Sequence, residues 1–471
     1  MVTWTHDLVV IGAGAAGLTA AGGAARLGLR VALVERDRMG GECLNTGCVP
    51  SKALLAAARR AYLMRTGAAF GVTAEGVGID FAQVSAHVQE AITAIAPHDS
   101  AERFQAWGVE VIRGSARFTG RRSIEVDGRT LAAPRIVVAA GSRPAIPAIE
   151  GLRGVPYLTN ETVFGLDRLP GHLVILGGGS MGLEMAQAFR RLGSAVTVIE
   201  PGRLLAQGDP EAVAVVVAQL AAEGVELRAG TQATRIMSVP GGVRVDVARG
   251  AAVMGSHLLV AAGRTPAVDG LGLEAAGVAA TPAGIGVDRR RRTSNRHVTA
   301  IGDCREGPRL THAAGYEGTL AVANIALGLP LAARYDALPS VLYTDPELAQ
   351  IGLTEGEARA RHGAVRVRRV GFADNDRAVT EGTTAGFIKI IQVRGRPVGV
   401  TIVGAGAEEL VLPWVLAMTG RASTWAVSGA IVPYPTRSDA SKAVAFSAYE
   451  GLVFGHLARG WALTLAALRR L

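Results

Sequence analysis

Length and composition exclude several classes of protein. The 471 residues predict about three domains, and 61 glycines with only 5% aromatic residues are typical of a large α/β protein rather than a disordered one or a disulfide-stapled secreted one. The net charge is +9, but the densest basic run, Arg289 to Arg292, has no interleaved aromatic residues, so we expect a solvated basic surface and no nucleic acid partner.

The first predicted element is a strand, Leu8 to Ile11, which leads into the loop GAGAAG at 12–17 and a helix of small residues. A second strand, Arg30 to Val34, ends at Glu35. Glycines at these positions allow a tight turn, the approach of a pyrophosphate and close packing of helix on strand, and the acid can bind a ribose hydroxyl. This order predicts a dinucleotide site. No secretory signal is apparent before it, so we expect a cytoplasmic protein.

Two cysteines five positions apart follow, in the segment GGECLNTGCVPSK. Pro50 favours the first turn of a helix, so Cys48 should lie at a helix N-terminus, where backbone N–H groups stabilise a thiolate. Lysine occurs at only three positions, and Lys52 shares a helical face with Cys48, although an incidental surface lysine is the alternative. We expect redox chemistry at Cys43 and Cys48. A structural bridge or a zinc site is the weaker reading, because Cys304 is the only other thiol, and no metal site is predicted.

A second glycine-rich loop repeats the strand–loop–helix–strand–acid pattern of the first. The strand Leu173 to Leu176 leads into GGGSMG at 177–182, a helix, the strand Ala195 to Ile199 and Glu200. The third glycine and the acid are 18 positions apart in both copies (17 to 35 and 182 to 200). Two dinucleotides in one chain imply electron transfer between them. Glu200 would repel a 2′-phosphate, so we expect NADH, with NADPH as the alternative because Arg203 lies nearby.

Three further strands are predicted beside these sites. Arg135 to Ala139 ends in AGSRP, and Leu259 to Ala261 ends in the similar AGRTP. Val298 to Asp303 ends in Gly302-Asp303. The two similar turns are expected either to cross between domains at the cofactor edges or to be ordinary turns.

Together these motifs resemble the pyridine nucleotide–disulfide oxidoreductases, flavoproteins that include dihydrolipoamide dehydrogenase, glutathione reductase and mercuric reductase. The likeness extends to GDCREGPRLTHAAGYEG at 302–318 and YTDPELAQIGLTEGEA at 343–358. It implies an α/β fold with two Rossmann-like dinucleotide-binding domains of the glutathione-reductase kind and an α+β dimerisation domain. The implied domains are 1–150 with 270–335 for FAD, 151–269 for NAD(P)H, and 336–471 for formation of a homodimer.

The resemblance also implies roles for single residues. Cys48 would face the flavin, Cys43 would be the interchange thiol that attacks substrate, and Lys52 would lie beside flavin N5 with Glu184 as its ion-pair partner. Glu35 would bind the adenosine ribose and Asp303 the ribityl chain. The other implied cofactor-binding positions are Gly12, Gly14, Ala16, Gly17, Gly41, Gly141, Ser142, Gly263 and Gly302 and, for NADH, Gly177, Gly179, Gly182 and Glu200.

The C-terminal part departs from the family pattern. Disulfide-reducing members carry a His-Pro-Thr segment whose histidine is the acid–base for the interchange thiol, oriented by a glutamate five residues later. Here the segment reads VPYPTRSD, with Tyr434 in the place of the histidine and Asp439 in that of the glutamate. An unperturbed tyrosine has a pKa of about 10 against about 6.5 for histidine, so it is a poor base. His312 is the substitute that we consider.

We therefore expect an FAD enzyme that passes electrons from NADH to the Cys43–Cys48 disulfide and then to an acceptor needing little general-base help. Candidate acceptors are a small-molecule or protein disulfide, a sulfur species, a soft metal ion or a quinone. One alternative is a dihydrolipoamide dehydrogenase or mercuric reductase proper, although the C-terminal cysteine pair of mercuric reductases is missing. Another is a redox-sensing or scaffold flavoprotein. The apolar segment Trp461 to Leu471 is expected in the core or a dimer interface, with a membrane surface as the alternative.

Overall fold

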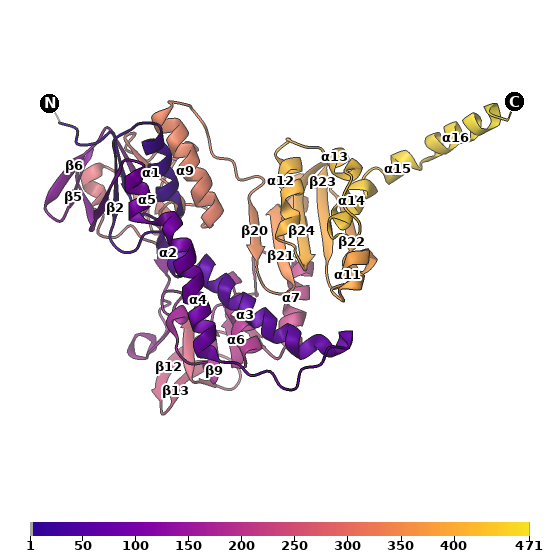
Figure 1. The fold of residues 1–471 in the computed structure, drawn as a ribbon, viewed down its shortest axis with the longest axis horizontal. Helices are drawn as coiled ribbons and strands as arrows, with labels where there is room; N and C mark the ends of the chain where they lie inside the picture. The colour runs from indigo at the N-terminus through magenta and orange to yellow at the C-terminus, as the bar shows by residue number, and fades with distance from the viewer. Residues whose placement is uncertain (1–2, 471) are drawn as a thin grey trace. The chain divides into compact units, whose positions relative to one another are not determined.

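The computed structural model describes residues 3–470, which form two compact units (Figure 1). The first unit extends to Leu204 and resumes over Gly224–Arg334, and the second comprises Leu205–Glu223 and the chain from Tyr335 onward. This division is coarser than the three domains predicted from the sequence, whose boundaries stay a prediction.

The first unit is built around a parallel sheet of five strands. Its order is β19 (Val298–Ala300), β7 (Arg135–Val138), β1 (Leu8–Ile11), β2 (Val31–Glu35) and β3 (Val109–Arg113). Strand residues alternate between two cores, as the pleat requires. Leu8 and Val10 contact helices α1 (Ala15–Arg26) and α9 (Thr311–Ala326). Val9 and Ile11 contact an antiparallel sheet of β4 (Ala116–Gly120), β5 (Ser123–Val126) and β6 (Arg129–Ala132).

A second parallel sheet in the same unit carries the second glycine loop. Its order is β11 (Glu226–Ala229), β10 (Ala195–Glu200), β9 (His172–Leu176) and β15 (His257–Val260). Helix α6 (Ser180–Leu192) contacts β9 and β10. The apolar side chains of β9 and β15 also form a core with the antiparallel strands β12 (Ala233–Val239), β13 (Gly242–Val247) and β14 (Val253–Gly255).

The two similar turns that the sequence left open cross between these sheets. After β7 the chain forms β8 (Ser142–Pro144) on its way to the second sheet, and after β15 it forms β16 (Arg264–Pro266) on its way back. β8 and β16 pair antiparallel, with Ser142 opposite Pro266. The predicted strand from Val298 to Asp303 is wrong at its end, because it stops at Ala300 and Gly302 adopts a left-handed φ of +70°.

The remaining elements of the first unit surround these sheets. Helix α3 contacts both α4 and α6. The bounds are α2 (Gly41–Asn45), α3 (Cys48–Thr66), α4 (Phe81–Ile95), α5 (Ala101–Ala106), α8 (Leu273–Ala276), β17 (Ala280–Thr281) and β18 (Gly284–Ile285).

The second unit contains an antiparallel five-stranded sheet. Its order is β20 (Pro339–Leu342), β21 (Glu347–Gly352), β24 (Arg396–Gly404), β23 (Phe387–Val393) and β22 (Arg366–Gly371). Trp414 of α12 and Val444 of α14 are buried in its core. The helices of the unit are α7 (Pro210–Ala222), α10 (Glu355–His362), α11 (Asp376–Thr380), α12 (Leu412–Met418), α13 (Thr424–Gly429), α14 (Ser438–Ser447), α15 (Glu450–Val453) and α16 (His456–Leu468).

A buried lysine explains why residues 205–223 belong to this unit. Lys389 of β23 is only 2% exposed, and its Nζ lies 2.7 Å from Oδ2 of Asp209 and 3.4 Å from Oε1 of Glu211. Asp209 also caps α7, because its carboxylate accepts a hydrogen bond from the Glu211 N–H. Removing an ammonium from water costs several kcal/mol unless a partner compensates it. The buried pair therefore holds the start of α7 against the sheet.

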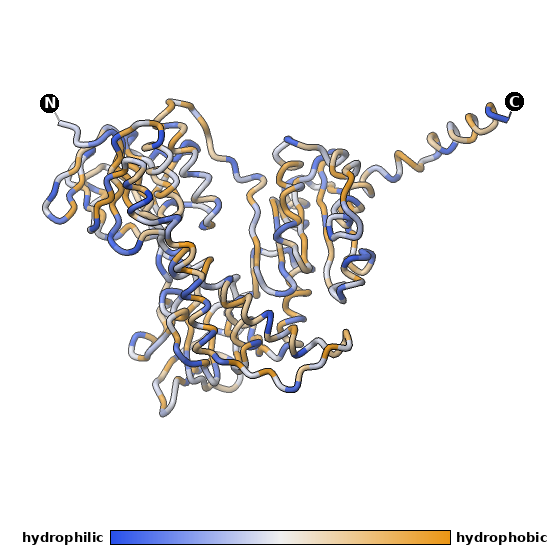
Figure 2. The backbone as a smooth tube through the Cα atoms, viewed as in Figure 1, coloured by the Kyte–Doolittle hydropathy of each residue, from blue (hydrophilic) through white to orange (hydrophobic). Residues whose placement is uncertain are grey.

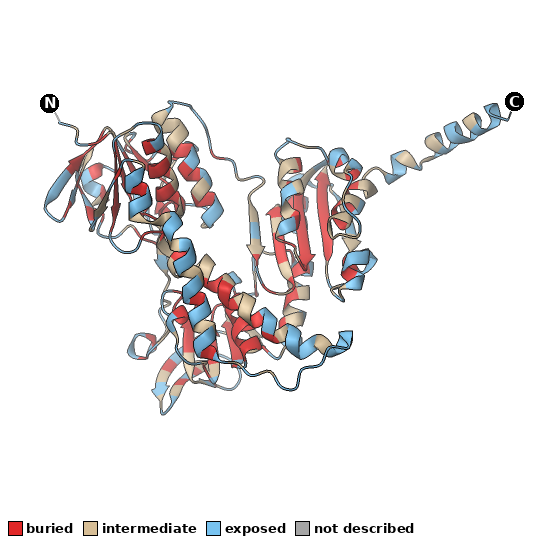
Figure 3. Cartoon of the chain, viewed as in Figure 1, coloured by how far each residue is buried: buried red, intermediate tan, exposed pale blue. Residues whose placement is uncertain are grey.

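The C-terminal helices are not part of the core. Neither α15 nor α16 contains a buried residue, and Figure 3 shows both in the colours of exposed and intermediate residues. The expectation that the segment from Trp461 packs in the core is therefore wrong for the described residues up to 470. A dimer interface and a membrane surface remain as its environments.

Candidate active site

The redox site is built on two short-range structural features, helix α2 and the start of helix α3. Cys43 lies within α2, and Cys48 is the first residue of α3. The Asn45 side chain donates hydrogen bonds to the carbonyls of Met39 (2.9 Å) and Gly41 (2.8 Å), which fixes the loop between the cysteines. Both cysteines are half-buried and have free thiols.

The two thiols have very different acidities. The pKa of Cys48 is lowered to about 6, first because the Cys43 thiol donates a hydrogen bond to its sulfur. Burial opposes this shift, whereas Thr311, whose Oγ1 is 3.2 Å from Sγ, and the Lys52 ammonium reinforce it. The pKa of Cys43 is raised, because it holds the shared proton and is itself buried. The pair therefore consists of a Cys48 thiolate and a protonated Cys43.

Lys52 connects the thiol helix to the helix of the second glycine loop. Its Nζ lies 2.8 Å from Oε2 of Glu184 in α6, whose side chain is almost fully buried. A carboxylate at this distance fixes the direction of the ammonium. Lys52 thus lies one helical turn from Cys48 with its charge held in place.

Both glycine loops have backbone conformations that only glycine tolerates. Gly12 has a φ of +102°, and Gly177 has a φ of +116°. A Cβ at Gly17 would lie 1.8 Å from the Gly12 oxygen, and one at Gly182 would lie 2.0 Å from the Gly177 oxygen. The first and third glycines of each loop are therefore required by packing alone.

The middle glycines differ, because their Cα atoms face open space. A Cβ at Gly179 would meet nothing within 4 Å, and one at Gly14 would touch only the Gly41 Cα, at 3.9 Å. A pyrophosphate can approach the backbone at these two positions, next to the start of a helix. The loops therefore fit FAD and a pyridine nucleotide.

The acid at the end of each second strand is anchored to its own loop. Glu35 accepts hydrogen bonds from the N–H groups of Ala13 (2.6 Å) and Asp37 (2.8 Å). Glu200 accepts equivalent bonds from Gly178 (2.7 Å) and Gly202 (2.8 Å). Each carboxylate oxygen retains a further lone pair for a ribose hydroxyl.

The crossing between the sheets brings other expected cofactor residues together. Ser142 donates a hydrogen bond to Oδ2 of Asp303 (2.8 Å), and Arg264 Nε donates to Ser142 (2.7 Å). The Gly302 N–H donates to Glu317 (2.7 Å), which holds the loop before Asp303. A Cβ at Gly302 would lie 3.2 Å from that of Ala16, while none of the neighbours approaches a Cβ at Gly141 or Gly263 within 4 Å.

Sequence reasoning missed a titratable carboxyl beside the thiols. Glu42 forms a close ion pair with Arg264 and accepts a hydrogen bond from the Asn160 side chain (3.0 Å). Burial raises the pKa of Glu42 to about 7, with Arg264 opposing the shift and Asp303 and the Cys48 thiolate adding to it. The position of Glu42 directly before Cys43 is the one sequence feature that could have indicated its role. Glu42 can carry a proton at neutral pH next to the redox pair.

Tyr434 and Asp439 lie in the second unit and are not hydrogen-bonded to each other. The Tyr434 side chain is 76% exposed, and its hydroxyl donates to Oδ2 of Asp376 at 2.7 Å. Asp439 instead accepts a bond from the Thr436 N–H (3.4 Å). The Asp376 carboxylate raises the pKa of Tyr434, and Asp439 adds a smaller effect. The phenol therefore holds its proton even more firmly than an isolated tyrosine. His312, the other candidate base, is an exposed residue of α9 next to Thr311.

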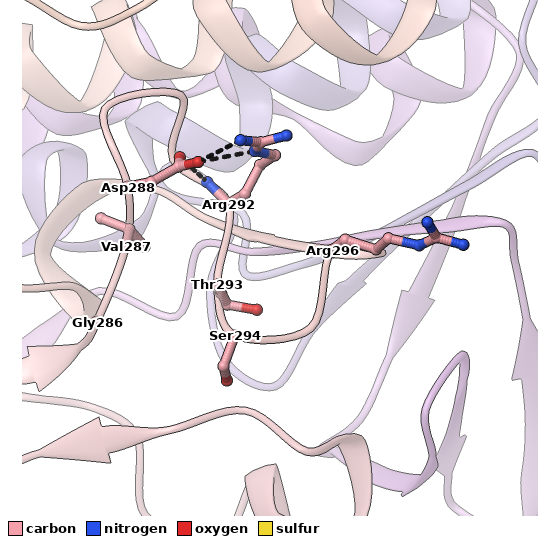
Figure 4. Close-up of a pocket in the computed structure, with 7 residues that line it drawn as sticks. All are labelled: Gly286, Val287, Asp288, Arg292, Thr293, Ser294 and Arg296. Atoms are coloured by element: carbon pink, nitrogen blue, oxygen red, sulfur yellow. Dashed lines mark hydrogen bonds and ion pairs between the residues drawn. The ribbon is translucent and has the colours of Figure 1, made fainter.

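A separate surface pocket carries none of these residues. It is lined by residues 286–288, 292–294 and 296, and Figure 4 shows Arg292 turned toward Asp288 within it. The Arg292 and Asp288 side chains form an ion pair at 2.7 Å, so they satisfy each other. The thiol pair and the glycine loops define the candidate site instead.

The acidity of Cys48 gives a direct prediction. In the reduced chain, the rate at which iodoacetamide alkylates Cys48 should be proportional to the fraction of Cys48 present as thiolate. This rate should therefore fall as the pH is lowered through about 6. Lys52→Met should move this midpoint upward, because it removes a positive charge that stabilises the thiolate. Peptide mass spectrometry after brief alkylation measures both cysteines, and Cys43 should react more slowly throughout. A Cys48 midpoint at the ordinary value of about 8.5 contradicts the assignment.

Comparisons with known proteins show the family to which the chain belongs. Residues 6–318 match the family described as "Pyridine nucleotide-disulphide oxidoreductase", and residues 338–445 match its dimerisation domain. A dihydrolipoyl dehydrogenase of Thermus scotoductus is 38% identical over 452 residues, which cover 92% of this chain and 95% of the relative. A mercuric reductase of Streptomyces lividans is 34% identical and covers 93% of this chain and 95% of its own length.

Two solved structures are similar over nearly the whole chain. The HOCl-induced flavoprotein disulfide reductase RclA from Escherichia coli has a TM-score of 0.84 at 27% identity, and the match covers 93% of this chain and 99% of RclA. LpdA from Mycobacterium tuberculosis has a TM-score of 0.86 at 29% identity, with 94% and 99% covered.

Proposed function

Because the chain belongs to the pyridine nucleotide–disulfide oxidoreductases, a family of flavin-dependent enzymes, we propose that it uses NADH to reduce its Cys43–Cys48 disulfide. The dithiol then reduces an acceptor that needs little general-base help. FAD, when bound at Gly12, Gly14, Glu35 and Asp303, supplies the two-electron transfer between the nicotinamide and the cysteines. The match to the dimerisation domain indicates a homodimer.

Two observations carry this proposal: the first unit holds an activated dithiol, and the second unit has, at the position of the family histidine, a tyrosine that keeps its proton. For a disulfide acceptor, Cys43 first loses its proton to water. Its Sγ then attacks one acceptor sulfur, and the other acceptor sulfur leaves as a thiolate. The Cys48 thiolate then attacks Cys43 Sγ, re-forms the internal disulfide and releases the second thiolate. Before the first attack, Cys43 must lose its proton, and Tyr434 holds its own too firmly to accept another.

Acceptors that lower this demand are therefore favoured. A disulfide with an acidic leaving thiol, or a persulfide or polysulfide, needs less proton transfer than a dialkyl disulfide because its leaving group is already stable as an anion. A soft metal ion bound by both thiolates, or a quinone reduced at the flavin, avoids the leaving group altogether. We propose the sulfur acceptors first, because the thiol pair is intact and no cysteine follows Cys304 to deliver a metal.

NADH is the proposed donor because Glu200 is fixed at the end of β10. Its two oxygens are held by the N–H groups of Gly178 and Gly202, so the carboxylate cannot swing away from a 2′-phosphate. NADPH should therefore bind more weakly than NADH.

The names of the similar proteins suggest two alternative activities. Dihydrolipoyl dehydrogenase activity is favoured by the 38% identical relative, and mercuric reductase activity by the 34% identical one. Tyr434 counts against the first and the lack of a late cysteine pair against the second. These relatives are named as enzymes, which gives the scaffold alternative no support.

Anaerobic reduction tests the relay and the donor together. Adding NADH to the oxidised, flavin-loaded enzyme should reveal two new thiols per chain, and NADPH should do so more slowly. Cys304 serves as an internal reference, because it is a free and fully buried thiol. Bleaching of the flavin without new thiols contradicts the relay.

An acceptor screen then tests the proposed substrate class. Turnover should be fast with polysulfide or an aromatic disulfide and slow with lipoamide or oxidised glutathione. Turnover of about 10 to 1000 per second with lipoamide or glutathione would show an ordinary member of the family and overturn the proposal.

A further inference from the structure

The C-terminal helix α16 has an apolar face that no other part of the described chain covers. Leu457, Trp461, Leu465 and Leu468 recur at helical spacing and so share one side of the helix. Leu457 is 92% exposed, and Trp461 is 65% exposed. Figure 2 shows hydrophobic and hydrophilic residues alternating along α16.

The polar residues of the same segment are all basic or neutral. Arg459, Arg469 and Arg470 follow Glu450, and no Asp or Glu occurs from 451 to 471. Arg459 is two residues from Trp461, which places it about 200° around the helix, on the opposite side. The segment therefore combines an apolar face with a charge of +3, which is complementary to an anionic surface.

The dimensions of α16 favour a helix lying on a membrane over one that crosses it. Residues Glu450–Leu468 are long and apolar enough to span a bilayer by composition. However, the structure divides them into α15 and a 13-residue α16, which is about 20 Å long against a hydrocarbon core of about 30 Å. Arg459 would also lie in the hydrocarbon of a spanning helix, where a guanidinium is disfavoured.

A second copy of the chain fits this face less well than lipid. The match to the dimerisation domain ends at residue 445, before α15 begins. Two copies of α16 brought together would contribute like charges at Arg459, Arg469 and Arg470, with no acid in either segment from 451 onward to compensate them.

We propose that α16 lies in the plane of an anionic lipid surface. Leu457, Trp461, Leu465 and Leu468 enter the boundary between headgroups and acyl chains, and the three arginines contact lipid phosphates. Tryptophan is favoured at this depth because its ring is amphipathic. The helix would bring a soluble reductase to membrane-associated acceptors, a role that does not depend on which acceptor the thiols reduce.

Vesicle co-sedimentation of the flavin-loaded, full-length enzyme tests this. We expect binding to vesicles of phosphatidylglycerol and phosphatidylcholine, weakened by salt, and much weaker binding to phosphatidylcholine alone. Reversing all three charges (Arg459→Glu, Arg469→Glu, Arg470→Glu) should lower the partition coefficient at least about 100-fold, at roughly fivefold per arginine lost. Leu457→Ser with Trp461→Ser should also abolish binding.

The matched control changes three exposed arginines elsewhere in the second unit, Arg361→Glu, Arg396→Glu and Arg421→Glu. It alters the net charge equally and should retain binding. If this control loses vesicle binding to the same extent, the basic protein binds vesicles non-specifically. If the unaltered enzyme does not sediment with anionic vesicles, the helix does not dock on lipid. Either result overturns the proposal. A third result would also overturn it: the unaltered chain does not bind vesicles, and the α16 variants dissociate the dimer in sedimentation velocity. NADH-dependent turnover should be unchanged in all variants, which verifies folding.

Discussion

Replacing Cys48 with serine is expected to lower reduction of a disulfide or polysulfide acceptor at least about 10³-fold. The serine hydroxyl cannot form the internal disulfide, and it cannot replace a thiolate whose pKa lies at about 6. Loss of a catalytic nucleophile lowers kcat by up to about 10⁶-fold in well-studied enzymes. The measurement is steady-state NADH oxidation with saturating acceptor, with flavin content determined in parallel.

The third cysteine provides the matched control for this variant. Cys304 is fully buried, its pKa is raised to about 12 by burial, and its thiol proton can be donated to the carbonyl of either Val138 (3.4 Å) or Ile301 (3.3 Å). Cys304→Ser keeps a donor for one of these carbonyls and should retain turnover. Quinone reduction should survive in Cys48→Ser, because it needs no dithiol. If reduction of disulfides also survives, the dithiol is not on the electron path.

Changing Tyr434 to histidine is expected to raise kcat/KM with lipoamide about 100-fold. A general base contributes about 10²- to 10⁴-fold, and histidine is half deprotonated at about pH 6.5, whereas the Tyr434 phenol stays protonated because Asp376 raises its pKa. The added activity should rise with pH as the histidine loses its proton. The pH profile of lipoamide reduction measures both effects.

The Tyr434→Phe variant tests whether Tyr434 is inactive as a base or is itself the acid–base group. Phenylalanine removes the hydroxyl that donates to Asp376 but should change lipoamide turnover by no more than about twofold, because that hydroxyl does not accept the Cys43 proton. A severe loss in the phenylalanine variant, together with no gain in the histidine variant, would mean that Tyr434 is itself the acid–base group.

Local motifs made the dinucleotide folds readable from the sequence. β1 spans Leu8–Ile11 as predicted, and the second loop lies between β9 and α6 as predicted. The predicted start of a helix at Cys48 is confirmed. The expected α/β fold of the glutathione-reductase kind and the family are confirmed by the comparisons. These features depend on glycines and short apolar runs whose conformational preferences act over a few residues.

Contacts between distant residues were not readable in this way. The helix N-terminus was expected to acidify Cys48, but the larger cause is the hydrogen bond from Cys43, which depends on how α2 and α3 are placed. Burial raises the pKa of Glu42 to about 7, and it outweighs the opposing charge of Arg264, an ion-pair partner 222 positions away in the chain.

The sequence by itself determined the two dinucleotide folds, the thiol pair and the replacement of the family histidine by Tyr434, because each is encoded within one contiguous segment. The tertiary structure alone decided that Asp376 rather than Asp439 bonds the Tyr434 hydroxyl, that Lys389 pairs with Asp209, and that α16 lies outside the core. The physical reason is that burial, ion pairing and pKa depend on the distances between residues that are far apart in the chain, and only the folded structure determines those distances.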